Sequence, residues 1–180
     1  WRLLDDPTKT VVAQIAPAVR VALGEEFGLP AGEITTGQIV AALRAIGFDK
    51  VYDTCFAADM TVFEEAEEFL ARKKAGERLP QFTSCWPAWV QYAEQYCSDM
   101  LANLSSCQSP QQMFGAVAKK TLPGELGIER KQLVVVSIMP CVAKKVEAAL
   151  PRFRVDSVAN VDHVLTTQEL AAMIRQAGLQ

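Results

Sequence analysis

Short apolar runs alternate with stretches of helical spacing along the whole chain. The run VVAQIAP (11–17) is ended by proline and predicts a buried strand, and KVYDT (50–54) and LPQFTS (79–84) predict two further short strands. The clearest signal is QLVVVSIMP (132–140), an unbroken apolar run typical of a parallel strand buried on both faces. A weaker strand is predicted at VDHVL (161–165).

Helical segments separate these predicted strands. Capping-box spacing, a threonine followed three residues later by Gln or Glu, marks helix starts at Thr35, Thr61 and Thr166. The predicted helices are 18–27 before Gly28, 35–47, 61–76, 87–101, one opened by Ser109, Pro110 and Gln112, and one from Thr166 towards Gly178. Strands that alternate with helices predict an α/β fold, with a mostly parallel sheet flanked by helices.

Several chemically interesting residues stand where predicted strands end. Pro17, Asp53, Cys85 and Cys141 all lie at or just after the end of such a strand. Because ligand sites on parallel sheets lie beyond the carboxyl ends of the strands, we expect these four residues to gather at one edge of the sheet.

Composition excludes several classes of function. The 180 residues suffice for one domain or one large lobe, and 50% of them are hydrophobic. A net charge of −3 gives no basic surface for nucleic acid. We find no apolar run of the roughly 20 residues that span a bilayer, and WRLLDDPTKT is not a signal peptide, so we expect a cytoplasmic protein. The five cysteines lack CxxC spacing, which suits a reducing cytosol or dispersed cluster ligation.

Three motifs carry a family resemblance. TSCWPAW (83–89), SSCQSPQQMFG (105–115) and MPCVAKKVE (139–147) resemble, in order, the catalytic domain of iron-only ([FeFe]) hydrogenases. The resemblance covers nearly the whole chain, from QIAPAVRVALGEEFG (14–28) to VDHVLTTQELAAMI (161–174). It implies that residues 1–180 are the N-terminal lobe of that domain, without the third motif, which carries two more cysteines.

The resemblance implies an iron cofactor in the longer parent protein. This H-cluster is a four-iron cubane, held by four thiolates, joined through a cysteine to a diiron unit with CO and CN⁻ ligands. Cys141 matches one cubane ligand, whereas Trp86 stands where the family's TSCC motif has another. With one of four ligands present, we expect the isolated chain to bind no cluster. Cys85, one residue away from the missing ligand, is an alternative ligand.

The resemblance also implies a path for protons. Cys85 matches the cysteine that carries protons to the diiron unit, a role that a thiol with a pKa of about 8.5 can fill, although a buried inert cysteine is the simpler alternative. Glu65, Glu68 and Arg72 share one helical stripe and, with Ser105, match a relay leading to Cys85. We expect burial to raise the pKa of the relay carboxylates. The alternative is a solvated flank beside the apolar face that contains Val62, Ala66, Phe69 and Leu70.

Other positions match the family's pocket around the diiron unit: Lys144, Met139, Ala16, Pro17, Ser109, Pro110 and Gln111. Lys144 matches a lysine that donates hydrogen bonds to a cyanide, and Ala16 and Pro17 match small residues that contact the other cyanide. The simpler alternatives are that Lys144 is a surface lysine, that Met139 belongs to the core and that Ala16 and Pro17 end a strand. A helix cap already explains Ser109 and Pro110. Cys97 and Cys107 are interpreted as core thiols and His163 as structural, and the resemblance implies that Cys55 stands where many relatives carry an acid.

These features predict a portion of an iron-only hydrogenase, which reversibly interconverts protons and electrons with H₂. We expect the chain alone to be inactive. Its partners would be the remainder of the catalytic domain, accessory iron–sulfur domains, and a ferredoxin or an NAD(P)H-linked subunit. Because Trp86 removes a cluster ligand, the alternative is a non-catalytic relative that acts as an iron–sulfur sensor or a cluster-assembly scaffold.

Overall fold

A four-stranded parallel sheet forms the centre of the molecule. The computed structural model describes residues 1–179. The strands lie in the order β2 (Lys50–Asp53), β1 (Thr10–Ile15), β3 (Leu133–Met139) and β6 (His163–Thr166). Every residue of β3 is buried, because helices cover both faces of the sheet. The predicted α/β class and parallel sheet are therefore confirmed.

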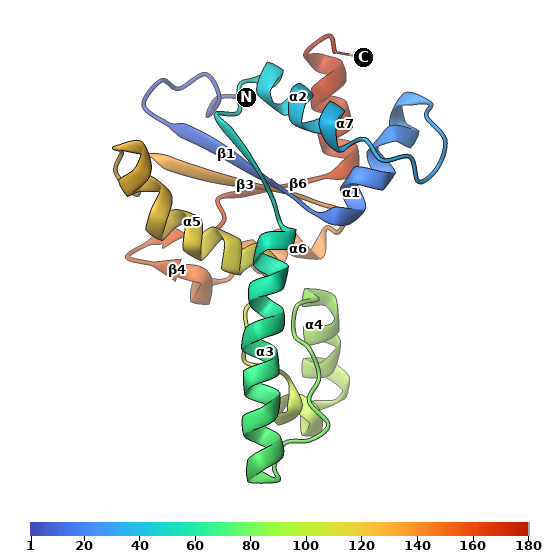
Figure 1. The fold of residues 1–180 in the computed structure, drawn as a ribbon, viewed down its shortest axis with the longest axis vertical. Helices are drawn as coiled ribbons and strands as arrows, with labels where there is room; N and C mark the ends of the chain where they lie inside the picture. The colour runs from blue at the N-terminus through green and yellow to red at the C-terminus, as the bar shows by residue number, and fades with distance from the viewer. Residues whose placement is uncertain (180) are drawn as a thin grey trace.

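Two helical layers enclose this sheet (Figure 1). One layer contains α1 (Pro17–Ala22), which continues into the 3₁₀ turn η1 (Leu23–Phe27), together with α2 (Thr36–Ile46) and α7 (Thr167–Gln176). The opposite layer is α5 (Pro110–Leu126), which packs on β3. The short elements α6 (Ala143–Ala149), η3 (Pro151–Phe153), β4 (Arg154–Val155) and β5 (Val158–Ala159) lie between β3 and β6 in the chain.

A helical arm, residues 55–108, projects from the α/β body (Figure 1). It contains α3 (Cys55–Ala75), α4 (Pro87–Tyr96) and the 3₁₀ turn η2 (Ser98–Asn103). No hydrophobic side chain of residues 55–108 larger than alanine is buried, apart from the ring of Pro87. Polar contacts must therefore supply much of the order within the arm.

Four predicted strands form, but the one at 79–84 was wrong. Phe82 makes only an isolated bridge with Leu104 inside the arm and joins no sheet. Its N–H donates to the Asn103 carbonyl at 2.9 Å, and its carbonyl accepts from the Ser105 N–H at 2.7 Å. Because these partners lie in a loop segment rather than in a strand, the pairing does not extend.

Of the predicted helix caps, those at Ser109 and Thr166 form and those at Thr35 and Thr61 do not. The capping box at Thr166 is confirmed, and Ser109 Oγ accepts from the Gln112 N–H as predicted. The box at Thr35 was wrong, because its hydroxyl donates to the Arg20 carbonyl at 2.9 Å. Thr61 was wrong as a start, because it lies inside α3 and donates to the Ala57 carbonyl. Helix α3 begins at Cys55, directly after β2.

Candidate functional site

The carboxyl ends of β1, β2 and β3 lie side by side. Ile15 pairs with both Asp53 and Ile138, so Pro17, Asp53 and Cys141 follow adjacent strand ends. Cys85 reaches this edge differently from the prediction, because it enters from the arm and not from a sheet strand. The Lys144 ammonium donates to the Cys85 carbonyl at 2.7 Å and connects the two regions.

Lys144 belongs to a buried polar cluster at the start of α5. The Glu147 carboxylate, 4% exposed, accepts from Ser109 Oγ at 2.8 Å and from Gln111 Nε2 at 3.0 Å, and it pairs with Lys144 at 3.2 Å. The structure therefore brings together Lys144, Ser109 and Gln111, and Lys144 is not a free surface lysine. Sequence reasoning assigned no role to Glu147, although its i, i+3 spacing from Lys144 in MPCVAKKVE could have revealed it.

The remaining pocket positions lie beside this cluster in the fold. Ala16 and Met139 are buried at the ends of β1 and β3, and the Ala16 N–H donates to the Ile138 carbonyl. Pro17 and Pro110 each occupy the first position of a helix, where a missing N–H costs nothing. The positions of these four residues are consistent with a pocket at the strand ends. They are equally consistent with the simpler interpretation as core residues and helix starts.

The predicted relay stripe turns inward. Glu68 Oε1 forms an ion pair with Arg72 at 2.6 Å, while Glu68 Oε2 accepts from Ser105 Oγ at 2.7 Å. Arg72, 8% exposed, also donates to the carbonyls of Asn103 and Leu104. The solvated-flank alternative was wrong, because Arg72 is buried and Glu68 is largely buried, whereas the neighbouring apolar Val62 is 66% exposed.

The pKa of Glu68 is lowered, whereas we expected from the sequence that burial would raise it. Burial raises the pKa of its carboxyl, but hydrogen bonds from Ser105 Oγ and the Ser106 N–H, together with Arg72, hold the pKa below its ordinary value. At neutral pH this group is a carboxylate. Glu65 lies one turn away, and its buried Oε1 has no hydrogen-bond partner within residues 1–179.

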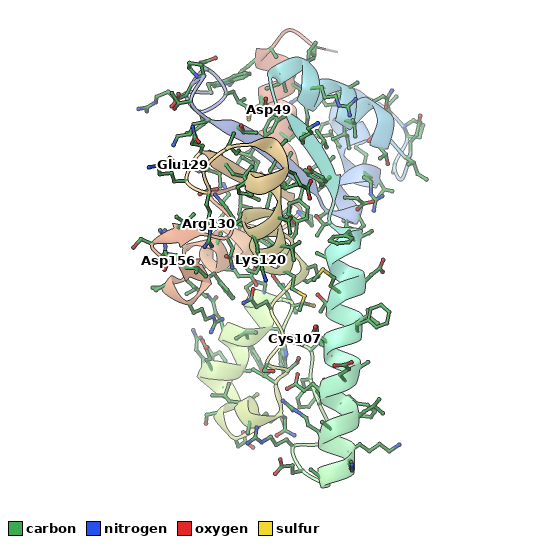
Figure 2. The ribbon with its side chains drawn as sticks, turned by 60° about the vertical axis from the view of Figure 1, so that its left-hand side comes forward. Asp49, Cys107, Lys120, Glu129, Arg130 and Asp156 are labelled. Atoms are coloured by element: carbon green, nitrogen blue, oxygen red, sulfur yellow. The ribbon has the colours of Figure 1, made fainter. Side chains whose placement is uncertain are left out.

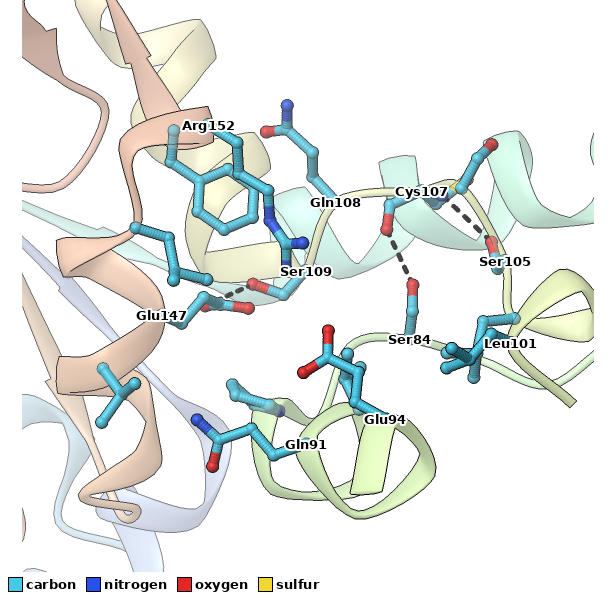
Figure 3. A pocket seen from close by; sticks show the side chains of 17 residues that line it. Ser84, Gln91, Glu94, Leu101, Ser105, Cys107, Gln108, Ser109, Glu147 and Arg152 are labelled. Carbon is cyan, nitrogen blue, oxygen red and sulfur yellow. Dashed lines mark hydrogen bonds between the residues drawn. The ribbon is translucent and has the colours of Figure 1, made fainter. Parts of the chain in front are cut away.

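A cavity of about 550 Å³ opens between the arm and the body. Ser84, Ser105, Cys107 and Glu147 line it, and the Glu94 carboxylate points into it (Figure 3). Ser84 Oγ donates to the Cys107 carbonyl at 2.9 Å, and the Cys107 N–H donates to Ser105 Oγ at 3.1 Å. These bonds connect the Ser105 segment to the residue that precedes Cys85. No hydrogen bond within the described residues joins Ser105 or Glu65 to the Cys85 thiol.

Cys107 itself lines the cavity and also contacts Glu68 of α3, beside which Figure 2 labels it. Its Sγ is 3.9 Å from Glu68 Oε2. Burial raises the pKa of this thiol, the Ser105 hydrogen bond lowers it, and the charges of Glu68, Glu65 and Glu64 raise it again, with a net increase. The interpretation of Cys107 as a plain core thiol therefore missed a contact with a relay carboxylate.

The side chains present do not fit a four-thiolate iron–sulfur cluster. Within residues 1–179, no group of three or more His, Cys, Asp or Glu side chains is placed to hold a metal ion. Trp86, which stands where the resemblance implies a ligand, is 58% exposed. Gln111 Oε1 is buried and has no hydrogen-bond partner among the residues that the structure describes, which leaves an unsatisfied polar atom beside Lys144 but adds no thiolate.

Comparison with known proteins identifies the family of this chain. The sequence model of the family described as iron only hydrogenase large subunit, C-terminal domain, matches residues 9–180. The chain belongs to this family. The described part of the structure contains no helix long and apolar enough to cross a membrane.

Iron-only hydrogenases are among its similar relatives. The chain is 50% identical to the NADP-reducing hydrogenase subunit HndD of Solidesulfovibrio fructosivorans, over 99% of the chain and 32% of that protein. It is 47% identical to the periplasmic [Fe] hydrogenase large subunit of Nitratidesulfovibrio vulgaris, over 98% of the chain and 42% of that protein. The chain is 33% identical to a cytosolic Fe–S cluster assembly factor of Xenopus tropicalis, over 95% of the chain and 37% of that protein.

Solved structures confirm the fold. An [FeFe]-hydrogenase examined for oxygen inactivation of its H cluster matches with a TM-score of 0.93 and 42% identity, over 99% of this chain and 46% of that chain. An apo form of HydA1 from Chlamydomonas reinhardtii matches with a TM-score of 0.92 and 43% identity, over 99% and 48%. The chain thus spans less than half the length of each relative described.

Proposed function

We propose that this chain forms part of an iron-only hydrogenase and supplies a segment of its proton path. The observation that carries the proposal is the inward row of Arg72, Glu68 and Ser105, which are joined by hydrogen bonds of 2.6 to 2.7 Å. A charged stripe of this kind, buried while apolar neighbours face solvent, needs a reason other than folding alone.

The row has the properties of a proton-transfer segment. Glu68 is a carboxylate at neutral pH and can accept a proton, while the Ser105 hydroxyl can donate to it and accept from a neighbour at the same time. The unpartnered Glu65 oxygen needs a donor, and a water molecule can supply one. Cys85 is the proposed end of this path.

The pocket roles are proposals of the same kind. Cys141 would supply a cluster thiolate, Lys144 a charged donor, and Ala16, Pro17 and Met139 apolar walls. Ser109, Pro110 and Gln111 would form the remaining wall, with Gln111 and Ser109 held in place by Glu147. Because the ligand set does not fit the cluster, the chain alone is inactive. The remaining catalytic half, accessory iron–sulfur domains and a ferredoxin or NAD(P)H-linked subunit complete the system, in the cytoplasm.

A second candidate is a non-catalytic relative that senses iron–sulfur clusters or assists their assembly. One observation favours it specifically: Trp86 replaces a cluster ligand, and its indole is largely exposed, so nothing in the local packing requires this residue. The similarity to cytosolic Fe–S cluster assembly factors adds support.

The deciding experiment measures iron and acid-labile sulfide per chain after strictly anaerobic reconstitution of the cubane and addition of a preformed diiron unit with its CO and CN⁻ ligands, together with H₂ evolution from reduced methyl viologen. Both are measured for the chain assembled with the C-terminal half of a solved relative. We expect activity only for Trp86→Cys, with Trp89→Cys as the control that adds a thiol elsewhere on the arm. About four irons bound tightly by the unaltered 180-residue chain would overturn the ligand argument and favour the sensor. Cluster loading of the assembled Trp86→Cys protein without H₂ would refute the hydrogenase proposal.

A further inference from the structure

The outer face of α3 exposes large apolar side chains to solvent. This face consists of the apolar residues Val62, Phe63, Ala66, Phe69 and Leu70 and the charged residues Asp59 and Lys73. Phe63 is 72% exposed, Leu70 62% and Phe69 41%. Figure 2 shows α3 at the edge of the molecule, with its outer side away from the other elements. Soluble chains rarely leave such a continuous apolar strip without a partner.

The residues of this face have a symmetric order about Ala66. Phe63 and Phe69 lie three positions on either side, Val62 and Leu70 lie four, and Asp59 and Lys73 lie seven. At about 100° per residue, all of them fall within about 60° of Ala66 around the helix axis. The sequence thus reads aromatic, aliphatic and charged outward from Ala66 in both directions, with opposite charges at the two ends.

Asp59 and Lys73 have no charged partner in the described part of the chain. Neither Asp59 nor Lys73 takes part in an ion pair among residues 1–179. Both are exposed, and both lie on the same strip as the apolar residues between them. A second helix lying against the strip would meet an acid at one end and a base at the other.

We infer that two copies of this chain associate through this face, with the two α3 helices antiparallel about a two-fold axis at Ala66. In this arrangement Phe63 packs on Leu70 of the second copy, and Val62 packs on Phe69 of the second copy, because the axis keeps each of these pairs on the same side of the helix crossing. Asp59 meets Lys73 of the second copy, and the axis generates the same ion pair again at the other end. A symmetric pair needs such a self-complementary surface, and the small Ala66 lets the helices approach closely at the crossing.

The size of the face sets the strength of association. Residues 59–73 of a helix are about 22 Å long, so one helix face buries less area than the roughly 800 Å² per partner of a standard interface. The dimer is therefore weak, with a dissociation constant in the range of about 10 to 100 µM. The order about Ala66 favours a second copy over an unrelated protein, which would have no need of palindromic residues.

The test is sedimentation velocity on the purified chain from low micromolar to submillimolar concentration. We expect a concentration-dependent monomer–dimer equilibrium. Asp59→Lys alone and Lys73→Asp alone each turn two attractive pairs into two repulsive ones, and each weakens the dimer about tenfold or more. The double exchange restores the opposite charges and recovers most of the affinity. Glu67→Lys, a charge reversal about 100° away from Ala66 on the same helix, leaves the constant unchanged.

Circular dichroism of each variant shows whether α3 stays folded, and Ala66→Glu, which places two carboxylates at the axis, gives a disruption that does not depend on the charge pairs. A monomer at every concentration would refute the inference and leave the strip to another partner. A dimer with the same constant in all variants would place the interface elsewhere. Failure of the double exchange to recover affinity, with α3 intact, would refute the antiparallel pairing.

Discussion

Glu68 is the residue on which the polar contacts of the arm converge. It accepts from Ser105 Oγ, from the Ser106 N–H and from Arg72, and these three donors come from two separate segments of the chain. The resemblance of the motifs predicted this grouping, but the hydrophobic pattern of α3 could not. A helix is normally expected to bury its apolar stripe, whereas α3 turns Val62 and Leu70 outward and Glu68 inward.

Replacement of Glu68 by glutamine tests the energetic value of this grouping. Its lowered pKa means that the carboxylate stabilises the fold above the ordinary glutamate value of 4.5 and that this stability is lost as the pH falls through the lowered pKa. At pH 7, Glu68→Gln should cost about 2 kcal/mol in the free energy of unfolding, because a charged acceptor of several hydrogen bonds is lost.

Urea unfolding at a series of pH values measures this difference. The native chain and Glu68→Gln should converge in stability below pH 4.5, as the native carboxylate becomes protonated. The exposed neighbour Glu67→Gln is the matched control and should follow the native chain throughout. A difference between the native chain and Glu68→Gln that stays constant at all pH values would show that packing, not charge, is responsible.

At the scale of elements, α5 joins the sheet, the arm and the β5–β6 connection. Lys119, on its buried face, pairs with Asp162 at 2.7 Å, and Asp162 also accepts from the Val135 N–H. Ser109 begins the helix beside Glu147. Gly115 lies so close to the Asn160 carbonyl that an added Cβ would be 2.5 Å from its oxygen.

Two glycine substitutions in α5 should therefore have opposite effects. Gly115→Ala forces the helix away from the Asn160 carbonyl and should lower the free energy of unfolding by about 2 kcal/mol. Gly124→Ala has nothing within 4 Å of the new Cβ and should raise stability by up to about 1 kcal/mol through helix propensity. Thermal unfolding of both variants measures the two changes in the free energy of unfolding. Equal effects would mean that the close approach at Gly115 does not constrain α5.

Helix starts were predicted correctly at Thr35, Ser109 and Thr166, but the predicted cap contacts form only at Ser109 and Thr166. Ser109 and Thr166 cap their helices because each hydroxyl oxygen accepts from an N–H three residues later, and Ser109 does so while its O–H donates to Glu147. Thr35 bonds to the Arg20 carbonyl instead, a partner 15 residues away that no local pattern reveals. Helix α3 starts six residues before Thr61 because β2 feeds directly into it through Thr54, which packs in the core beside Gln14.

For the whole molecule, the apolar runs predicted the four strands of the sheet and their parallel class correctly but added a strand at 79–84 that does not form. A central strand must be apolar on both faces, so 132–140 could be recognised from sequence. The candidate site was only partly predictable, because Cys85 reaches Lys144 through the arm and Glu147 gains its role from three distant partners. The cavity between the arm and the body likewise follows from tertiary packing and not from any motif.

The shortage of buried apolar side chains in the arm has a consequence for local unfolding. The body contains β1 and β3 deep in its core, whereas residues 55–108 bury no hydrophobic side chain larger than alanine apart from the ring of Pro87. Because the stability of a segment follows the apolar contacts that it makes, the arm should open independently of the sheet. Amide hydrogen exchange should therefore be fast in α4, slow in β3, and in α4 faster still in Glu68→Gln. Uniform protection across both elements would show that the arm and the body unfold as one cooperative unit.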